Sequence, residues 1–370
     1  MNIKKYKLPY SKKDISFIQE HIQIILENGY LTDGGPYVSQ FEKSWAKYIG
    51  TKYSVATNSC TTALEIILKG LGITSGSVIV PNYTFYATPL SVLNSGANVI
   101  YGDIDPTTLS LSLESIKKNI QNDTKAVIIV HVAGIISNEI FEIKKYCKEN
   151  NLYLIEDAAC AHGAEIKGQK AGTLGDISAF SFHHSKVLTT GEGGMINTND
   201  EALVDKLKRL RSIGLDRNIN NWEVFELGNN YKMSEITSVL GILHTNKADE
   251  IVSERRKIAK FYDDNLQFNK NFCKISFTCK SAYYKYVVFC KDKEIIKNKL
   301  ADKNIHLPPN VYDYLCSEQD ITKQTNTINY KDNFPVCKYA MKHNMCLPLY
   351  NGLTNNELKH IVNSINDIIC

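Results

Sequence analysis

Apolar and polar positions follow two alternating periods through the first half of the chain, and this alternation predicts the fold class. Short apolar runs such as Ser77 to Val80 and Lys125 to Val132 are typical of buried strands. Segments such as Val38 to Tyr48 instead carry apolar side chains at helical spacing. Strands and helices that alternate in this way predict an α/β fold with a large, mainly parallel sheet and helices on both faces.

The individual elements follow from the same pattern. An N-terminal amphipathic helix is expected over Asp14 to Leu26, ending at Asn28-Gly29. Further helices are expected over Val38 to Tyr48, Ala63 to Leu71, Ala87 to Asn94, Ser112 to Asn119, Glu139 to Asn150 and Glu201 to Arg211. Strands are expected over Ser54 to Ala56, Ser77 to Val80, Ala97 to Tyr101, Lys125 to Val132, Tyr153 to Glu156, Ile177 to Phe182 and Met195 to Thr198, with a tight hairpin or loop over Ile166 to Gly172.

The pattern changes in the last third of the chain, where it predicts a smaller C-terminal α+β domain. At 370 residues the chain exceeds the usual size of one core, so we expect a large domain over residues 1–245 and a small one over 246–370. One long amphipathic helix, Glu235 to Leu266, would link them. The remaining elements expected are strands Lys274 to Phe277 and Tyr284 to Phe289, helices Glu294 to Asp302 and Asn355 to Ile369, and a mobile polar loop over Thr322 to Asn333.

One lysine stands where a sheet of this kind binds its ligands. Lys186 follows the apolar strand Ile177 to Phe182 and precedes the glycine-rich run 191–194. An amine with the ordinary pKa of about 10.4 is a poor nucleophile, but desolvation or nearby positive charge lowers that pKa and frees the lone pair for Schiff-base chemistry. Asp157 ends another apolar strand, at the edge where open α/β sheets hold ligands, and a buried acid there needs a cationic partner.

A third segment supplies groups that could bind phosphate. The run 57–62, Thr-Asn-Ser-Cys-Thr-Thr, lies between a strand-like segment and an apolar helix. Hydroxyls and free amides at a helix N-terminus bind a dianionic phosphate, although serine and threonine also open most helices as ordinary caps. Pyridoxal phosphate requires a lysine for its aldehyde, an acid for its pyridine nitrogen and donors for its phosphate. Together the three segments predict a pyridoxal phosphate site.

These segments, together with others, resemble the DegT/DnrJ/StrS sugar aminotransferases from about Gly29 to the C-terminus. The resemblance is carried by residues 58–64, 81–88, 156–159, 181–183 with Lys186, 191–194 and 228–235. It implies a pyridoxal phosphate transaminase of fold type I, usually a homodimer. Such an enzyme would move an amino group from L-glutamate or glutamine to the keto carbon of a carbohydrate-derived acceptor, mostly a nucleotide-linked ketosugar for cell-surface polysaccharide synthesis.

The resemblance also implies roles for individual residues. Lys186 and Asp157 would be catalytic, Lys186 holding the cofactor aldehyde and Asp157 pairing with the pyridinium nitrogen. Asn230 would reach the phosphate of the neighbouring subunit's cofactor, so that a homodimer shares its active sites. The other cofactor-binding residues implied are Ser59, Cys60, Thr61 with the amide of Thr62, Phe85, Cys160 and Ser181, and the substrate-binding residues are Lys232 and Tyr312.

Plain alternatives stand beside several of these roles. Phe85 could be a simple core residue. Ser181 could bond only its own strand, and Asn230 could be a turn residue beside Gly228. Lys186 itself could be an ordinary surface lysine.

Three departures from the family pattern affect the expected site. Cys160 stands where members have a glutamine or histidine facing the cofactor ring, and a thiol is a weak hydrogen-bond partner. His162 is a candidate substitute, or a structural histidine. Lys232 replaces an arginine and lacks its flat, two-pronged donor. The stretch 306–316 contains Tyr312 but no arginine, which keeps a small phosphorylated ketone such as dihydroxyacetone phosphate open as acceptor.

Other function classes receive less support. A sugar dehydratase of the same family would lack Lys186, whereas a decarboxylase on the same scaffold stays open. A regulatory protein that binds the cofactor without transamination would normally bring a DNA-binding segment, and none is evident. The formal charge of +4 comes from scattered residues, so nucleic acid is not an expected partner.

Cysteine usage and hydropathy predict the compartment. The ten cysteines include no C-x-x-C pair and no metal-ligand spacing, which favours free thiols in a reducing cytoplasm and no metal. No apolar run has the length of a membrane span, and the start of the chain lacks the apolar run of a signal peptide. We therefore expect a cytoplasmic protein that does not bind membranes.

Overall fold

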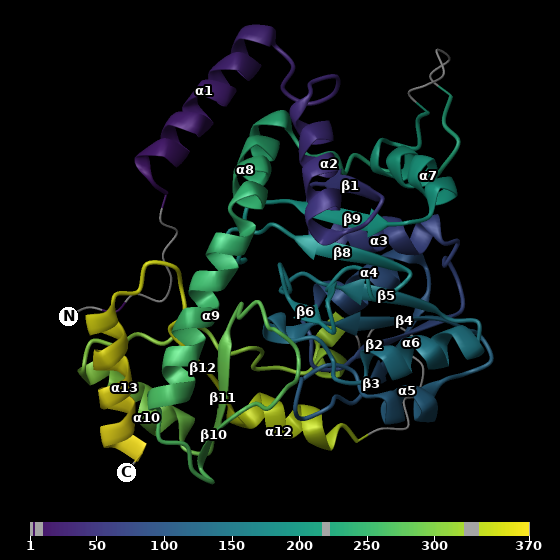
Figure 1. The fold of residues 1–370 in the computed structure, drawn as a ribbon. Coiled ribbons are helices and arrows are strands. Elements are labelled where there is room, and N and C mark those ends of the chain that lie inside the picture. The colour runs from purple at the N-terminus through teal and green to yellow at the C-terminus, as the bar shows by residue number, and fades with distance from the viewer. Residues whose placement is uncertain (1–2, 4–9, 217–222, 322–332, 370) are drawn as a thin grey trace.

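A seven-stranded sheet forms the centre of the protein (Figure 1). The computed structural model describes residue 3 and residues 10–216, 223–321 and 333–369. Strand order is β1-β9-β8-β5-β4-β2-β3, and only β9 runs antiparallel to its neighbours, so the predicted mainly parallel sheet is confirmed. The strands are β1 (Tyr53–Thr57), β2 (Ser77–Pro81), β3 (Asn98–Gly102), β4 (Thr124–Val130), β5 (Tyr153–Asp157), β8 (Ile177–Ser181) and β9 (Gly194–Thr198).

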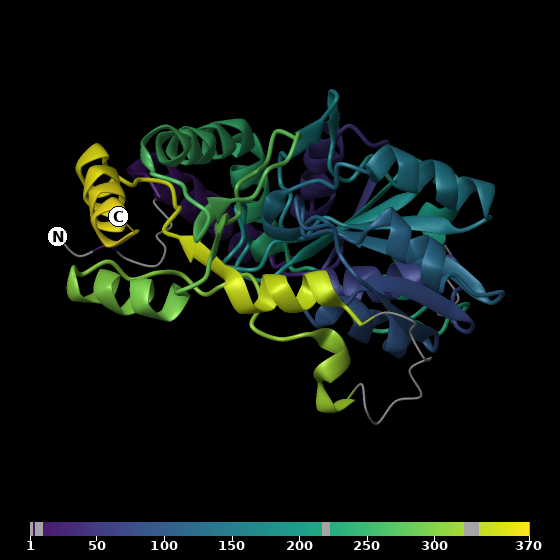
Figure 2. The same cartoon turned by 90° about the horizontal axis from the view of Figure 1, so that it is seen from below.

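Helices lie on either side of this sheet (Figure 2). Strands β2 and β8 are buried along their whole length, as expected for strands with both faces covered. Helix α3 packs against α4 and α7, while α2 packs against β1 and α8. The helices of this part are α1 (Lys12–Asn28), α2 (Tyr37–Ile49), α3 (Cys60–Gly70), α4 (Ala87–Ser95), α5 (Leu113–Asn119), α6 (Ile140–Glu149), α7 (Glu201–Arg211) and α8 (Glu235–Asn246), with a 3-10 turn η1 (Val132–Gly134).

Local sequence signals set the ends of several elements. Helix α1 begins with a capping box in which Ser11 and Asp14 bond each other's backbone N–H, and it ends at Gly29 in the left-handed region. Helix α3 begins at Cys60, three residues before the prediction, because the Ser59 hydroxyl accepts a hydrogen bond from the Thr62 N–H. The expected hairpin is formed by β6 (Glu165–Ile166) and β7 (Gln169–Lys170).

The C-terminal third builds a second, smaller sheet with a core of its own. Strand β11 pairs antiparallel with both β10 and β12. Its core takes side chains such as Tyr262, Phe272, Leu300 and Ile361 from the sheet and from the helices beside it. The elements are α9 (Ala248–Asn265), β10 (Phe272–Lys274), β11 (Tyr286–Cys290), α10 (Lys293–Asp302), η2 (Cys316–Glu318), α12 (Pro335–His343), β12 (Asn344–Leu347) and α13 (Asn355–Ile369).

Two predictions for this region are wrong. The strand placed over Lys274 to Phe277 lies instead at Phe272–Lys274, because that segment pairs with β11. The single helix Glu235 to Leu266 is two helices, separated at Lys247, whose side chain forms an ion pair with Asp14. The apolar stripe continues across the break, so the pattern alone does not reveal it. Helix α12 and strand β12 were not expected at all.

Two further expectations remain untested. The loop expected over Thr322 to Asn333 falls, except for Asn333, outside the described residues. The division after residue 245 stays a prediction, since the larger core also takes in residues of the C-terminal third such as Leu315 and Cys337. Among the described residues, no helix has the length and apolar character needed to cross a membrane.

Gly194→Ala is expected to destabilise the fold by about 1–3 kcal/mol, because overpacking a tight contact costs that much. A Cβ on Gly194 would overlap the Ser59 carbonyl oxygen, which belongs to the cap of α3. Gly72→Ala is the control. A Cβ on Gly72 would meet no atom within 4 Å, but the backbone there is left-handed (φ +74°). This variant should therefore lose about 1 kcal/mol of stability through backbone strain alone. Urea unfolding measures both variants, and a Gly194→Ala protein as stable as the wild type would contradict the close approach.

Candidate active site

The predicted catalytic residues meet at one edge of the large sheet. Asp157 is the last residue of β5 and Ser181 the last of β8, and these two strands are direct neighbours. Strand β9 lies between β1 and β8 and is antiparallel to both, so β1 runs in the same direction as β8 and β5. Strand β1 leads into α3. The chain then turns after β8, with the Lys186 N–H bonded to the His183 carbonyl. Carboxyl ends of parallel strands thus gather the lysine, the acid and the start of α3.

The Lys186 amine is held by acidic neighbours. Its Nζ donates to Cys160 Sγ at 3.2 Å and lies 4.7 Å from the centre of the Tyr284 ring. Burial lowers the pKa of Lys186, but Cys160, Tyr284 and Asp157 favour the charged form and together raise it above the ordinary value. Desolvation lowers this pKa as expected, but the expected net decrease is wrong, because the acidic neighbours outweigh burial.

Asp157 is a buried carboxylate with both oxygens in use. Thr88 Oγ1 donates to Oδ2 at 2.7 Å, and the Ala159 N–H donates to Oδ1 at 3.1 Å. No cation forms an ion pair with Asp157 among the described residues. Burial raises its pKa, and the hydrogen bonds from Thr88 and Ala159 and the charge of Lys186 lower it without restoring the ordinary value. A protonated pyridine nitrogen would supply the cation that this acid lacks.

The start of α3 forms a cradle for an anion. In any helix the N–H groups of the first turn have no partner inside the helix, and here these belong to Cys60 and Thr61. Gly194 allows β9 to approach this turn closely. The Ser59 hydroxyl bonds the Thr62 N–H at 3.2 Å, so it serves as the cap of the helix. Ser181 is buried, and its Oγ accepts only a long bond of 3.4 Å from the His183 N–H.

Phe85 lies exposed on the loop that joins β2 to α4. It has 61% of its surface exposed, so the alternative of a simple core residue is wrong. The Thr88 N–H bonds the Phe85 carbonyl, which places the ring one turn from the threonine that holds Asp157. An exposed aromatic ring at this position is available to stack on a flat ligand.

The thiols belong to the same cluster. Burial raises the pKa of Cys60, and nearby Asp157, Lys186 and Cys160 also act on it. His162, the candidate substitute for the missing glutamine, is fully buried instead among Trp45, Phe180 and Phe182. Burial, assisted by the charge of Lys186, lowers its pKa to about 3, so His162 is a neutral structural histidine.

Tyr312 reaches the site from the C-terminal third. Its ring packs edge-on against Tyr83, whose hydroxyl donates to the Tyr312 carbonyl at 3.2 Å. Burial raises the pKa of Tyr312 well above its ordinary value, and Cys160, Asp157 and Tyr284 add to the effect. The phenol therefore lies close to the catalytic residues.

Asn230 and Lys232 lie on a loop beside the start of α3. The Tyr231 carbonyl accepts the Asn58 N–H at 2.8 Å. The Asn230 side chain is exposed, and Lys232 forms an ion pair with Asp33 at 3.1 Å. Among the described residues, neither the Asn230 side chain nor the Lys232 side chain contacts Lys186 or Asp157.

Sequence reasoning missed three residues of this site. Thr88 bonds Asp157, and Tyr284 faces Lys186. Arg255 is buried on α9 and donates to the carbonyls of Tyr283 and Tyr284. These bonds fix the loop that carries the two tyrosines, called the tyrosine loop below. Thr88 ends the run 81–88 that carried the family resemblance, so a signal for it existed. Neither Tyr284 nor Arg255 has a local signal, because tertiary contacts alone define their roles.

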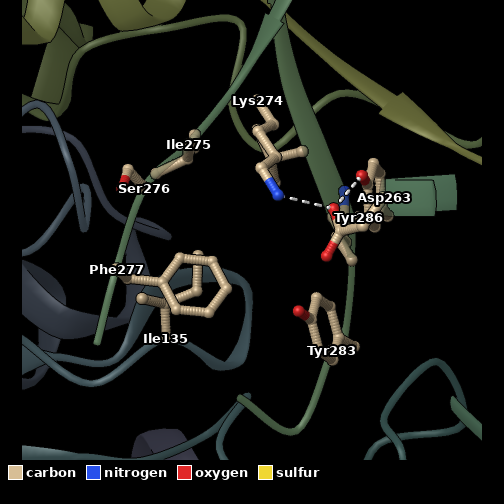
Figure 3. Close-up of a pocket in the computed structure, with 10 residues that line it drawn as sticks. Ile135, Asp263, Lys274, Ile275, Ser276, Phe277, Tyr283 and Tyr286 are labelled. Carbon is tan, nitrogen blue, oxygen red and sulfur yellow. Dashed lines mark hydrogen bonds and ion pairs between the residues drawn. The ribbon is translucent and has the colours of Figure 1, made fainter. Parts of the chain in front are cut away.

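The tyrosine loop also borders a separate pocket of about 130 Å³ (Figure 3). Asp263 accepts hydrogen bonds there from the Tyr286 hydroxyl at 2.7 Å, and Lys274 lies 3.1 Å away from it. Phe277 and Tyr283 face the same space. None of the predicted site residues lines this pocket.

Comparison with known proteins identifies the family. The model of the DegT/DnrJ/EryC1/StrS aminotransferase family matches residues 12–366. The chain belongs to this family. GDP-perosamine synthase from Escherichia coli O157:H7 is 32% identical over 353 residues, covering 94% of each chain. The spore coat polysaccharide biosynthesis protein SpsC of Bacillus subtilis (strain 168) is 31% identical over 390 residues, covering 98% of this chain and 97% of SpsC.

The solved structures agree. Helicobacter pylori PseC, an aminotransferase involved in the biosynthesis of pseudoaminic acid, superposes with a TM-score of 0.88 at 26% identity and 99% coverage of both chains. The chain is thus a fold type I, pyridoxal phosphate-dependent aminotransferase, which confirms the resemblance. The observed site fits the cofactor, since it offers a buried acid that forms no ion pair with the described residues, a lysine whose charge acts on that acid, and a helix end open to phosphate.

His162→Phe is expected to make stability less dependent on pH. The folded-state pKa of His162 is about 3, whereas the unfolded value is about 6.5. The unfolded chain therefore binds an extra proton as the pH falls below about 6.5, and stability decreases by up to about 1.4 kcal/mol per pH unit through this residue. Urea unfolding at several pH values between about 7 and 4.5 measures the slope for both proteins. Identical slopes would show that His162 titrates normally.

Proposed function

We propose that the enzyme transfers an amino group from L-glutamate or glutamine to the keto carbon of a nucleotide-linked ketosugar that serves cell-surface polysaccharide synthesis. The observation that carries this proposal is the buried Asp157 beside Lys186 at the mouth of α3, which matches the needs of the cofactor. The relatives support the substrate class, since one is named a GDP-perosamine synthase and another a spore coat polysaccharide biosynthesis protein. The cytoplasm is the proposed location, supported by the nine free cysteines among the described residues.

The residues would divide the chemistry between them. When bound, pyridoxal phosphate supplies an electron-accepting ring that stabilises a carbanion at the substrate carbon. Asp157 would keep the pyridine nitrogen protonated, and Thr88 would hold that carboxylate in place. Lys186 would first bind the cofactor aldehyde and, once released by the donor, carry the proton away from the donor's α-carbon. The raised pKa of Lys186 would suit it to donate a proton. Loss of the contact with Cys160 would lower that pKa and so would favour removal of a proton by the amine.

The remaining predicted residues would bind rather than react. The Cys60 and Thr61 amides, helped by the Ser181 hydroxyl, would hold the phosphate, while the Thr62 amide stays bonded to the Ser59 hydroxyl. Phe85 would cover one face of the ring. Tyr312 would contact the acceptor, because its phenol lies near Asp157 and Cys160. Lys232 would face the substrate only with the partner subunit in place.

A homodimer with shared sites is part of the proposal. Exposed apolar side chains lie on several loops around Asn230. A backbone bridge joins Ser212 to Asn230, and the Glu235 N–H donates to the Leu31 carbonyl, so these loops lie next to one another. An apolar surface of this kind is typical of a contact between subunits. The exposed apolar residues are Tyr30, Leu31, Ile213, Val224, Phe225 and Leu227.

The small-ketone alternative rests on two features, the absence of arginine from the stretch 306–316 and the lysine at position 232. The relatives do not favour it, since their names point to nucleotide-linked sugars and polysaccharide. Lys285 partly compensates for the absent arginine, because its Nζ reaches the carbonyls of Pro309 and Asn310 and so places a cation beside this stretch.

A screen of keto acceptors with glutamate tests the substrate class. We expect amine product from at least one nucleotide-linked 4-ketosugar and none from dihydroxyacetone phosphate, with 2-oxoglutarate as the second product. Lys186→Ala is expected to abolish both products and the visible absorbance of the bound cofactor. Product is read by mass. Turnover of dihydroxyacetone phosphate alone would select the alternative, and an active Lys186→Ala variant would overturn the transaminase mechanism.

Mixed dimers test whether the sites are shared. Asn230→Asp would place a carboxylate beside the partner's phosphate, and Lys186→Ala removes the catalytic amine. If Asn230 acts across the interface, a dimer of one Lys186→Ala chain and one Asn230→Asp chain contains one intact site. Random mixing of the two inactive proteins should therefore restore about one quarter of wild-type activity. No recovery, with mixed dimers verified by mass spectrometry, would show that Asn230 serves its own chain, whereas an Asn230→Asp protein that is active by itself would show that Asn230 serves no site.

A further inference from the structure

Two reactive groups touch at the centre of the site. Cys160 Sγ and Lys186 Nζ lie 3.2 Å apart and share a hydrogen bond. Cys160 is 5% exposed, but the Lys186 side chain is partly exposed, so a small solute can approach along the lysine. Peroxides oxidise thiols, and the sulfur that would be oxidised is the atom that contacts the lysine amine.

We propose that Cys160 is a peroxide-sensitive thiol whose oxidised form bonds covalently to Lys186 and reversibly disables the catalytic amine. The proposal goes beyond the proposed function, because transamination requires no thiol at this position. It assigns a modification site to a pair that joins the expected catalytic lysine to Cys160, one of the expected departures from the family pattern.

The two steps balance as follows. The Cys160 thiolate attacks one oxygen of hydrogen peroxide, the O–O bond breaks, and the hydroxide that leaves takes a proton to become water. The sulfur is then a sulfenic acid, oxidised by two electrons. The neutral Lys186 amine attacks this sulfur, an S–N bond forms, the S–O bond breaks, and the oxygen leaves as a second water. The protein loses two hydrogen atoms in total.

The first step prepares the second. Cys160 is one of the acidic neighbours that raise the pKa of Lys186 and keep its amine protonated. A sulfenic acid carries no comparable negative charge, so oxidation removes this support while burial, which lowers the pKa, remains. The lone pair needed for attack therefore becomes available where the electrophilic sulfur already lies within contact distance.

The state of the lysine decides when the bond can form. If Lys186 has the role proposed above, its amine is occupied in the resting holoenzyme and becomes free after the donor's amino group has been accepted. The oxidation then affects only that half of the reaction cycle. The expectation that the resting holoenzyme cannot form the S–N bond rests on the proposed function, whereas the S–N bond itself does not.

Mass spectrometry of the full-length holoenzyme tests the proposal. The enzyme is incubated with L-glutamate, desalted to remove the keto acid, treated with hydrogen peroxide and digested with trypsin. We expect a chain lighter by two hydrogen atoms, loss of cleavage after Lys186, and a linked pair of peptides containing Cys160 and Lys186. A thiol reductant should reverse all three changes. Cys160→Gln, whose amide cannot be oxidised in this way, should show none of them.

Cys60→Ser provides the matched control for the neighbouring thiol and should still form the link. A disulfide between Cys60 and Cys160 would also remove two hydrogens, but trypsin would still cleave after Lys186, and that result would overturn the proposal. Oxygen added to Cys160 without loss of this cleavage would overturn it too, as would a link that retains an oxygen atom. Equal linkage in resting enzyme without glutamate would support the S–N bond and contradict the proposed bond between Lys186 and the cofactor.

Discussion

The active site depends on one buried carboxylate that forms no ion pair with the described residues. Asp157 lies at the end of β5, with Thr88 and Ala159 donating hydrogen bonds to its two oxygens. Burying a carboxylate is unfavourable unless a cation pairs with it, and burial here raises the pKa of Asp157 despite the nearby charge of Lys186. In the proposed function the cofactor's ring nitrogen would be the cation that pairs with this acid.

The sheet topology makes this arrangement possible. Parallel β5 and β8 end at the same edge, so the acid and the turn that bears Lys186 start from neighbouring positions. β9 then returns antiparallel and places Gly194 against the cap of α3. The lysine, the acid and the start of α3 come from distant parts of the chain, yet the ends of four adjacent strands, β5, β8, β9 and β1, bring them together.

Much of this could be predicted from the sequence, and the failures have physical reasons. Strands such as β2 and β8 are apolar throughout, so a single pattern defines them. The start of the C-terminal sheet was misplaced because the Phe272–Lys274 segment is selected by pairing with β11, not by its own pattern. Tyr284 was missed for a similar reason, since its position against Lys186 depends on Arg255, a buried side chain on an otherwise ordinary amphipathic helix.

Cys160 shows how one substitution can leave the reaction class unchanged and still alter the site. An amide in this place would donate a hydrogen bond, whereas the Cys160 sulfur accepts one from Lys186. Cys160 and Tyr284 are the neighbours that most favour the charged state of Lys186, and a charged amine has no lone pair for nucleophilic attack. If Lys186 has the proposed role, this contact would act on the free amine, so its influence would be strongest in the states where the lysine is not bonded to the cofactor. Cys160 would then affect proton transfer more than cofactor binding.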